Sequence, residues 1–584
     1  MRFHRFHLEL ASVAFLLIAC ESNTTPTSPR PIAAQRALND VGDDYVQVVG
    51  VGDPAIDVPA VQAAVDRGGA IVLRGHFSFE APPTKLVSPV LSSGGAYPPL
   101  AEVLVSKAVT ISGAAEDDEM PTIEGGTIPF YVEAPNAPVT IRGLRFVRPI
   151  SNAVLVYAVH GLEIAANRVE GLDPFAANGH GHAIGIITTG GIPNPTIPAN
   201  PENIAGKLSI VHNYIDVMGA AGTSTLGIVV YSAGVAGAEA DFDVSGNTVK
   251  NTTEAAINFR RIVGRARIEH NAITTGSLVV TPPVRPAVIR AANSGTYVIA
   301  HNSIDCGWAA SDAEGIGVFS QFSAWPVDHV VVADNDVTMS APAGTGFTAF
   351  SAGIGVFGFA NDNVVRDNRI RGAARAGVSI PSVFPLPPLA PATPQGNTFI
   401  DNRFVDFTPT DADIFVGTHA FATRIVGPGT VDDQGTGTVV GPTAAARWNA
   451  IAGAQTLTHA ISQQLGSRIF AYLSLAQYNA AIAAEDAKGG EHRASVPAAV
   501  AAASVAVLSS FYPDQTASFG ALLAEQEAQS QPPNEPHSDF GAGTAIGRAA
   551  GAAIIARAAT DGFTSSADTF RSEPGASRGL HRPR

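Results

Sequence analysis

Residues 302–335 read NSIDCGWAASDAEGIGVFSQFSAWPVDHVVVADN, a stretch that begins and ends with an asparagine. Three short segments within it, residues 303–305, 316–320 and 329–332, alternate apolar with other residues or are rich in valine. Such segments predict β-strands rather than helices. The next repeat, which ends 33 residues later at Asn368 (368 minus 335), has the matching segments 336–338, 354–357 and 363–366. The sequence therefore predicts a repeating unit of three strands.

The asparagine at the start of this unit recurs along the chain, each time two residues before an apolar residue. The eight copies are separated by 46, 34, 24, 31, 33, 33 and 34 residues, by subtraction of their numbers: Asn167, Asn213, Asn247, Asn271, Asn302, Asn335, Asn368 and Asn402. Repeats of about 20–50 residues predict coils that stack on one shared core. Three strands per coil predict an all-β, right-handed parallel β-helix. We expect the asparagines to point inward, to bond to the backbone and to each other, and to adopt the left-handed conformation that a tight bend needs.

Composition limits the class of protein. The chain has 584 residues, more than one ordinary domain, and its charged residues amount to only 15%. The net charge of −15 argues against nucleic acid as a partner. The two cysteines, Cys20 and Cys306, exclude a disulfide framework, and we expect Cys306 to be an inert thiol in a loop or in the core.

The first twenty residues have the pattern of a targeting segment. Basic residues are followed by an apolar run, too short for a stable membrane span, that ends in LIAC at residues 17–20. This pattern resembles a bacterial lipoprotein signal peptide. The resemblance implies an exported protein of the cell envelope, attached to a membrane through lipidated Cys20; an ordinary secretory signal is the alternative. Residues 21–44 are predicted to be a flexible tether.

The predicted β-helix extends over residues 45–441. Residues 57–65 have helical spacing, with Asp57 as the expected N-cap and Gly68 at the end of the helix. This beginning resembles the pectate lyase superfamily, in which a short amphipathic helix covers the open end of the core. An uncovered end would expose core residues and unpaired strand edges.

Alanine-rich segments replace the strands from residue 442, and residues 442–563 are predicted to be a smaller all-α domain. Helices are expected over about 461–476, 495–510, 519–530 and 542–560. Gly543, Gly547 and Gly551 would allow close packing of the last helix. Residues 564–584 are predicted to be a disordered tail.

Three segments of this region resemble the first helices of vanadium-dependent haloperoxidases and type 2 phosphatidic acid phosphatases: residues 467–482, 504–513 and 543–549. Those families bind vanadate or phosphate through Lys-x6-Arg-Pro and Pro-Ser-Gly-His motifs. Lys488 and Arg493 do not have that spacing, and no Pro-Ser-Gly-His occurs. We therefore expect a truncated, catalytically inactive domain that uses no vanadate.

The resemblance to pectate lyases implies a substrate site on the outward face of one sheet. Alternation assigns Ile184, Ile228, Ile257 and their equivalents to the core, and in the strand of Arg290 it assigns only Ile289. The outward row would then contain Ile187, Val229, Arg260, Arg290, Phe319 and Phe357. Neighbouring strands lie about 4.8 Å apart, so Arg260 would adjoin Arg290, and Phe319 would adjoin Phe357. Two guanidinium groups beside two rings suit an acidic polysaccharide, although an ordinary outer surface is the alternative.

Titratable residues occur in the loops that lead to this face: Asp173, His180, Glu254, Asp312 and Glu314. A glycosidase needs two carboxylates, and a lyase needs a base and a group, such as Ca²⁺, that neutralises the sugar carboxylate. Asp173 with His180, or Asp312 with Glu314, could fill these roles. The alternative is that all five are solvated loop residues.

Histidines also follow a pattern. The rings of His180 and His182 would point to one side of a strand, but no third ligand is evident and no metal site is assigned. His212, His270 and His301 each precede a ladder asparagine and are expected to stack at a turn.

These features favour an exported, lipid-anchored protein that binds glycans or partners along one face. A lyase or hydrolase of acidic polysaccharide is the alternative, and a truncated haloperoxidase or phosphatase fusion is a further one. No clear carboxylate pair is visible in the sequence, which favours binding over catalysis.

Overall fold

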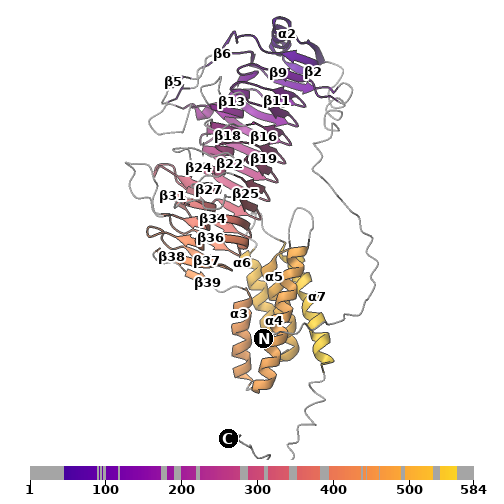
Figure 1. Ribbon diagram of the computed structural model, residues 1–584, viewed down its shortest axis with the longest axis vertical. Coiled ribbons are helices and arrows are strands. Elements are labelled where there is room, and N and C mark those ends of the chain that lie inside the picture. The colour runs from indigo at the N-terminus through magenta and orange to yellow at the C-terminus, as the bar shows by residue number, and fades with distance from the viewer. Residues whose placement is uncertain are drawn as a thin grey trace, which may run out of the picture.

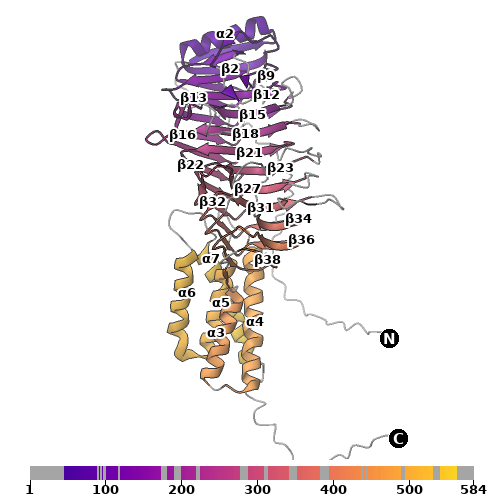
Figure 2. The same ribbon diagram turned by 90° about the vertical axis from the view of Figure 1, so that its left-hand side faces the viewer.

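The structure is a computed structural model that describes residues 45–88, 91–92, 95–96, 100–115, 119–172, 180–189, 199–218, 224–276, 287–307, 313–340, 347, 351–381, 394–435, 439–441, 444–459, 461–487, 494–530 and 539–561. A tall stack of strands precedes a bundle of helices (Figures 1 and 2). The predicted fold class, a parallel β-helix followed by an all-α domain, is confirmed.

The strands form three parallel sheets, and most coils contribute one strand to each sheet. Within a sheet, each strand pairs with its equivalents in the neighbouring coils. The first sheet contains β7 (Val103–Val105), β10 (Phe130–Ala134), β13 (Asn152–Ala165), β15 (His180–Ile187), β18 (Ser224–Ala233), β21 (Ala255–Ile262), β24 (Ala287–Ala292), β27 (Glu314–Ser320), β31 (Ala352–Gly358), β34 (Arg369–Ile380), β36 (Arg403–Val416) and β38 (Val431–Asp433).

The long strands β13, β34 and β36 also continue into a neighbouring sheet. Apart from β13, the second sheet contains β1 (Tyr45–Val51), β2 (Gly69–Ser78), β8 (Val109–Gly113), β11 (Val139–Arg142), β16 (Ile204–Val211), β19 (Ala240–Ser245), β22 (Gly264–Glu269), β25 (Thr296–Ala300), β29 (Val331–Ala333), β33 (Val364–Arg366), β35 (Thr398–Ile400), β37 (Arg424–Val426) and β39 (Val439–Gly441).

The third sheet begins with the end of β2 and ends with the beginnings of β34 and β36. Between them lie β9 (Thr122–Glu124), β12 (Arg145–Val147), β14 (Arg168–Glu170), β17 (Tyr214–Asp216), β20 (Thr248–Lys250), β23 (Ala272–Thr274), β26 (Ser303–Cys306) and β30 (Asp336–Met339). Short pairs outside the three sheets are β3 (Lys85–Leu86) with β6 (Leu100–Ala101), β4 (Leu91–Ser92) with β5 (Gly95–Ala96), and β28 (Val327–Asp328) with β32 (Ala360–Asn361).

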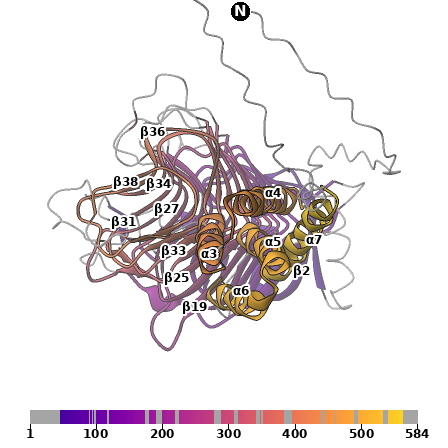
Figure 3. The same ribbon diagram turned by 90° about the horizontal axis from the view of Figure 1, so that it is seen from below.

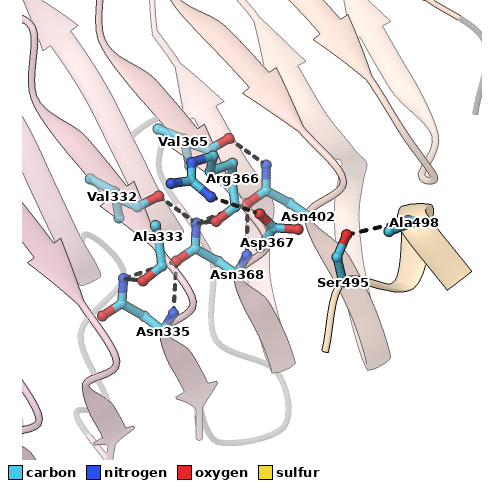
Figure 4. A network of polar contacts seen from close by, with 10 residues as sticks. All are labelled: Val332, Ala333, Asn335, Val365, Arg366, Asp367, Asn368, Asn402, Ser495 and Ala498. Carbon is cyan, nitrogen blue, oxygen red and sulfur yellow. Dashed lines mark hydrogen bonds and ion pairs between the residues drawn. The ribbon is translucent and has the colours of Figure 1, made fainter. Parts of the chain in front are cut away.

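The asparagine ladder is inward, as predicted. Asn335 donates from Nδ2 to Oδ1 of Asn368, and Asn368 donates in the same way to Asn402, each at 2.9 Å (Figure 4). All eight asparagines are at most 2% exposed. Each amide therefore satisfies buried backbone groups and links one coil to the next.

One detail of the ladder prediction was wrong. The asparagine itself does not adopt the left-handed conformation; the residue before it does, as at His212 (φ 56°) and Asp367 (φ 56°). A second, shorter ladder was missed: Asn363 donates from Nδ2 to Oδ1 of Asn397 at 3.0 Å. Its signal was visible, because Val365 and Phe399 follow these asparagines at the same spacing.

Helix α2 (Pro54–Arg67) packs at the N-terminal end of the coil and ends at Gly68, whose φ is 77°. Its N-cap is Asp53, whose side chain accepts a hydrogen bond from Ala55 N, so the prediction for Asp57 was wrong. Asp57 is buried and accepts from the backbone N of Val51 and of Ser78, both at 2.9 Å. This carboxylate therefore ties the helix to the first coils.

The helical domain contains α3 (Ala444–Thr458), α4 (Gln463–Asp486), α5 (Val496–Phe511), α6 (Thr516–Ser530) and α7 (Phe540–Ala559). Helix α3 was not predicted. Gly547 packs against α5 so closely that an added Cβ would overlap the carbonyl oxygen of Ala499, in agreement with the predicted role of these glycines. Arg403 of β36 forms an ion pair with Glu485 of α4 at 3.6 Å. None of the described helices combines the length and the apolar character needed to span a membrane.

Candidate functional site

The outward side chains of the first sheet form two rows rather than the single row predicted. The strand register aligns Tyr231, Arg260, Ala292, Phe319 and Phe357 in one row. The second row aligns Val229, Asn258, Arg290, Gly317 and Gly355. The predicted adjacency of Phe319 and Phe357 is confirmed, but Arg260 does not pair with Arg290 in the register.

Two positions of the predicted row, Val229 and Arg290, were wrong. The register places Tyr231 between Ile187 and Arg260, and Ala292 between Arg260 and Phe319. In the strand of Arg290, Ala291 lies opposite Phe259 in the core, whereas only Ile289 of this strand was predicted to point inward. With Ile289 as the only inward residue of this strand, either Arg290 or Ala292 could align with Arg260, so the register was uncertain by two residues. The other assigned inward positions, including Ile184, Ile228 and Ile257, do belong to the core.

Arg260 and Arg290 are nevertheless close to the same ring. The guanidinium carbon of each lies 5.9 Å from the centroid of Phe319, and Phe319 stacks on Phe357 with centroids 4.7 Å apart and an interplanar angle of 10°. Guanidinium groups are attracted to ring faces. The two rings therefore stack on each other, and Phe319 also contacts the two guanidinium groups, so the rings do not form an open platform for a sugar.

The four predicted binding residues are also more buried than expected. Arg260 is 4% exposed and Arg290 is 3% exposed, and Phe319 and Phe357 are similarly buried. Arg290 Nη1 contacts Glu254 Oε1 at 3.3 Å, and Ser224 Oγ donates a hydrogen bond to the other oxygen of Glu254. A buried ion pair of this kind, rather than a solvated arginine row, occupies the face.

Arg260 has a different set of contacts. Its Nε donates to Asn258 Oδ1 at 3.3 Å, and Asn258 Nδ2 donates to the hydroxyl oxygen of Tyr231 at 3.1 Å. Considering only the described residues, Arg260 Nη1 is buried and has no hydrogen-bond partner. Because leaving a buried charged donor unsatisfied is costly, this atom is a natural position for an anionic group from outside the chain.

The local electrostatics follow from burial and these neighbours. Burial alone would raise the pKa of Glu254, but the charge of Arg290, the hydrogen bond from Ser224 and the charge of Arg260 outweigh it and lower the pKa. Burial, together with repulsion from Arg290, lowers the pKa of Arg260 to about 10. At neutral pH, Glu254 is therefore a carboxylate and Arg260 is a cation.

A second glutamate lies on the same face. The carboxylate of Glu314 folds back over Gly317, so that a Cβ at Gly317 would overlap it, and a Cβ at Gly355 would approach it to 3.3 Å. Glu254 immediately precedes β21, Arg290 lies in the next coil and Glu314 begins β27 in the coil after that. The structure therefore places Arg290 in the coil between the two carboxylates.

This combination was not predicted, although both glutamates were. The pairs predicted from the sequence were Asp173 with His180 and Asp312 with Glu314. Asp173, Asp312 and the side chain of His180 lie outside the described part of the structure. Tyr231, Asn258 and Ser224 were missed; the signal for Asn258 was a polar residue between the apolar core residues Ile257 and Phe259.

The histidines have ordinary surroundings. The ring of His182 lies 6.3 Å from that of Tyr231, and His270 stacks on His301 at 5.0 Å, as predicted for turn histidines. Cys306 is buried in the core. The described residues contain no group of three potential metal ligands, and a role for Ca²⁺ stays a prediction.

Several solved structures are similar to this chain. The A-module of the mannuronan C-5 epimerase AlgE4 from Azotobacter vinelandii is 14% identical, with a TM-score of 0.33 and coverage of 68% of this chain and 97% of that one. PfbA, a surface adhesin of Streptococcus pneumoniae, is 14% identical, with a TM-score of 0.38 and coverage of 65% and 92%. The Dettilon tailspike protein is 12% identical, with a TM-score of 0.29 and coverage of 68% and 69%.

No protein-family model and no curated protein matches the chain. At these identities and TM-scores, the similar structures carry no argument about function. The strand register described above establishes the parallel β-helix by itself.

Proposed function

We propose that the outer face of the first sheet binds an acidic glycan and that Arg260 receives a carboxylate of the sugar. The observation that carries this proposal is the buried Nη1 of Arg260, which has no hydrogen-bond partner within the described ranges. Arg290 is already paired with Glu254 at 3.3 Å, so Arg260 is the cation with capacity for a further anion. Arginine suits a carboxylate because its planar fork can donate two parallel hydrogen bonds.

Burial determines how such binding would proceed. Since Arg260 is only 4% exposed, ligand entry requires a local rearrangement, and association should be slower than at a rigid open site. A buried ion pair is screened less by salt than an exposed one. We therefore expect weaker salt dependence of the affinity than a solvent-exposed arginine row would give.

Calorimetric titration of the full chain with oligogalacturonate, oligomannuronate and neutral cello-oligosaccharides tests the proposal. We expect an acidic oligosaccharide to bind and the neutral ones not to bind. Arg260→Gln should weaken binding roughly ten- to hundredfold, which corresponds to the loss of one charge-assisted hydrogen bond of about 1.5–3 kcal/mol. The matched control is Arg265→Gln, because Arg265 is largely exposed and belongs to β22 in the second sheet.

The proposal fails if no acidic oligosaccharide binds to folded protein. It also fails if Arg265→Gln weakens binding as much as Arg260→Gln. Circular dichroism of each variant separates loss of binding from loss of fold.

Cleavage of the bound polysaccharide is a second candidate function, supported by the placement of Glu254 and Glu314 in the coils on either side of Arg290. An ionised Glu254 could act as a base or nucleophile, and Glu314 could act as its acid partner. Incubation with polyuronates, followed by assays for new reducing ends and for unsaturated products, distinguishes hydrolysis, elimination and binding alone. Activity that survives both Glu254→Gln and Glu314→Gln would exclude this pair.

A further inference from the structure

The helical domain contains a cavity that is unrelated to the face of the β-helix. It has a volume of about 280 Å³ and lies between α5, α6 and α7. Figure 3 shows α6 and α7 on either side of α5. Its lining residues are mostly small or apolar: Ala502, Val505, Ala506, Gly520, Leu523, Ala524, Glu527, Thr544 and Arg548. The volume is near the lower end of small-molecule sites, which begin at about 300 Å³.

Thr544 gives the cavity a polar group without a partner. Its Oγ1 is buried and makes no hydrogen bond to any described residue, and the residue is 9% exposed. Some hydroxyls in these helices bond to the carbonyl four residues earlier, as Thr456 does to Ala452 at 2.8 Å and Ser504 to Val500 at 2.7 Å. Ser509 Oγ, like Thr544 Oγ1, is buried and has no partner among the described residues. Thr544 differs from Ser509 in that it lines the cavity, so its hydroxyl can donate a hydrogen bond to a group inside the cavity.

The charged residues at the cavity have opposite signs. Arg548 is one helical turn after Thr544 on α7, so that both side chains lie on the same face of that helix. Glu527 lines the cavity from α6, and both charged side chains are exposed. Neither has an ion-pair partner among the residues that the structure places. The cation beside Thr544 favours an anion there, and the nearby carboxylate disfavours a second negative charge.

We propose that this cavity binds a small apolar molecule with a single carboxylate, such as a medium-chain fatty acid. The apolar chain contacts Ala502, Leu523 and Ala524. Thr544 Oγ1 donates a hydrogen bond to the carboxylate, and Arg548 pairs with its charge. A dianionic phosphate fits less well because Glu527 repels it.

Gly520 offers a direct way to block the cavity. A Cβ added at this glycine meets no atom within 4 Å, so a larger side chain can enter without displacing backbone. Gly520→Leu also replaces a helix-interior glycine with a better helix former. We therefore expect this variant to fold and to fill the space that the ligand would occupy. Gly453→Leu is the matched control, because Gly453 lies in α3 and its nearest potential contact is Phe470 Cζ at 4.0 Å.

The test is calorimetric titration of the full chain with octanoate, octylamine and octyl phosphate. We expect octanoate to bind with one-to-one stoichiometry and at least tenfold more tightly than either of the others. Gly520→Leu should abolish octanoate binding, while Gly453→Leu should leave it unchanged. Thr544→Val and Arg548→Gln should each weaken binding about five- to tenfold, and Arg557→Gln, a change outside the cavity lining, should not.

Thermal unfolding shows whether each variant is still folded, so that a loss of binding can be distinguished from a loss of structure. Thr544→Val removes a buried hydroxyl that has no partner, so the variant should unfold at the same temperature as the parent or at a higher one. Absence of octanoate binding to the folded parent overturns the proposal. So does binding that persists in Gly520→Leu, or tighter binding of octylamine or octyl phosphate than of octanoate.

Discussion

Oδ1 of Asn302 accepts two hydrogen bonds from Asn271, one from the backbone N at 3.0 Å and one from Nδ2 at 2.9 Å. The same Nδ2 also donates to the carbonyl oxygen of Val244 at 2.9 Å. One side chain thereby joins three successive coils. Because Asn271 is only 1% exposed, water cannot replace these bonds if the amide is removed.

Asn271→Leu should accordingly destabilise the protein by about 1–3 kcal/mol or more, since it leaves buried backbone partners unsatisfied. Thr274→Leu is the control, because Thr274 is exposed three residues later on β23. Thermal and urea unfolding of the two variants measure the effect. An unchanged melting temperature for Asn271→Leu would contradict a structural role for the ladder.

The Arg290–Glu254 pair predicts a pH-dependent effect. Removal of one partner of a buried pair costs roughly 3–5 kcal/mol, because the other charge stays buried. In the parent, the lowered pKa of Glu254 contributes stability that is present above the unfolded carboxyl pKa and is lost as the pH falls through the folded pKa. Arg290→Met should therefore destabilise most near neutral pH and less in acid, where Glu254 becomes protonated.

The control for this prediction is Arg265→Met, which breaks an exposed pair with Asp241 and should destabilise the protein far less than Arg290→Met. The double variant Arg290→Met/Glu254→Gln should recover part of the lost stability. Melting temperatures measured between acid and neutral pH provide the comparison. A loss that is constant with pH would argue against Glu254 as the uncompensated charge.

The contribution of Asp401 to stability should depend on pH in the opposite direction from that of Glu254. Burial, together with repulsion from Asp367 one coil away, raises the pKa of Asp401 to about 7, although Arg403 opposes the shift. The unfolded value is about 3.9, so this carboxyl favours the folded state at low pH and loses that contribution as the pH rises toward 7. Asp401→Asn should therefore increase the melting temperature at pH 8 and have little effect at pH 4.

Asp406→Asn is a close control, because Asp406 is exposed and has the same φ of 49° as Asp401. Asparagine tolerates this conformation, so neither substitution adds backbone strain. Equal effects of the two variants at pH 8 would rule out Asp401 as the titrating group.

Attachment to a membrane through Cys20 remains a proposal, since residues 1–44 lie outside the described part of the chain. Cys20→Ser should move the protein from the membrane fraction to the soluble fraction of its producing cells, because a covalent lipid supplies the affinity for the bilayer. Fractionation followed by immunoblotting measures this distribution. The variant's retention in the membrane fraction would contradict lipidation as the anchor.

Some of the candidate site followed from the sequence and some did not. Arg260, Arg290, Phe319 and Phe357 were selected because alternation separates outward from inward residues, and Glu254 and Glu314 were selected as titratable residues of the loops that lead to this face. Their partners could not be selected, since a contact such as Arg290 with Glu254 depends on the register of two coils and on a loop conformation. Alanine is only weakly apolar, so the alternation pattern did not show that Ala291 points into the core, and the register of its strand was missed.

The sequence by itself determined the repeating coil. In every coil, a buried asparagine and an apolar residue two positions later occupy the same local environment. Each coil therefore needs the same two residue types, and they recur at regular intervals in the sequence. Only the tertiary structure decided that Asp53 rather than Asp57 caps α2, that the outward arginines are buried, and that two glutamates from different coils approach the row of Arg290. These features depend on contacts between residues far apart in the chain, and such contacts impose no periodic pattern on the sequence.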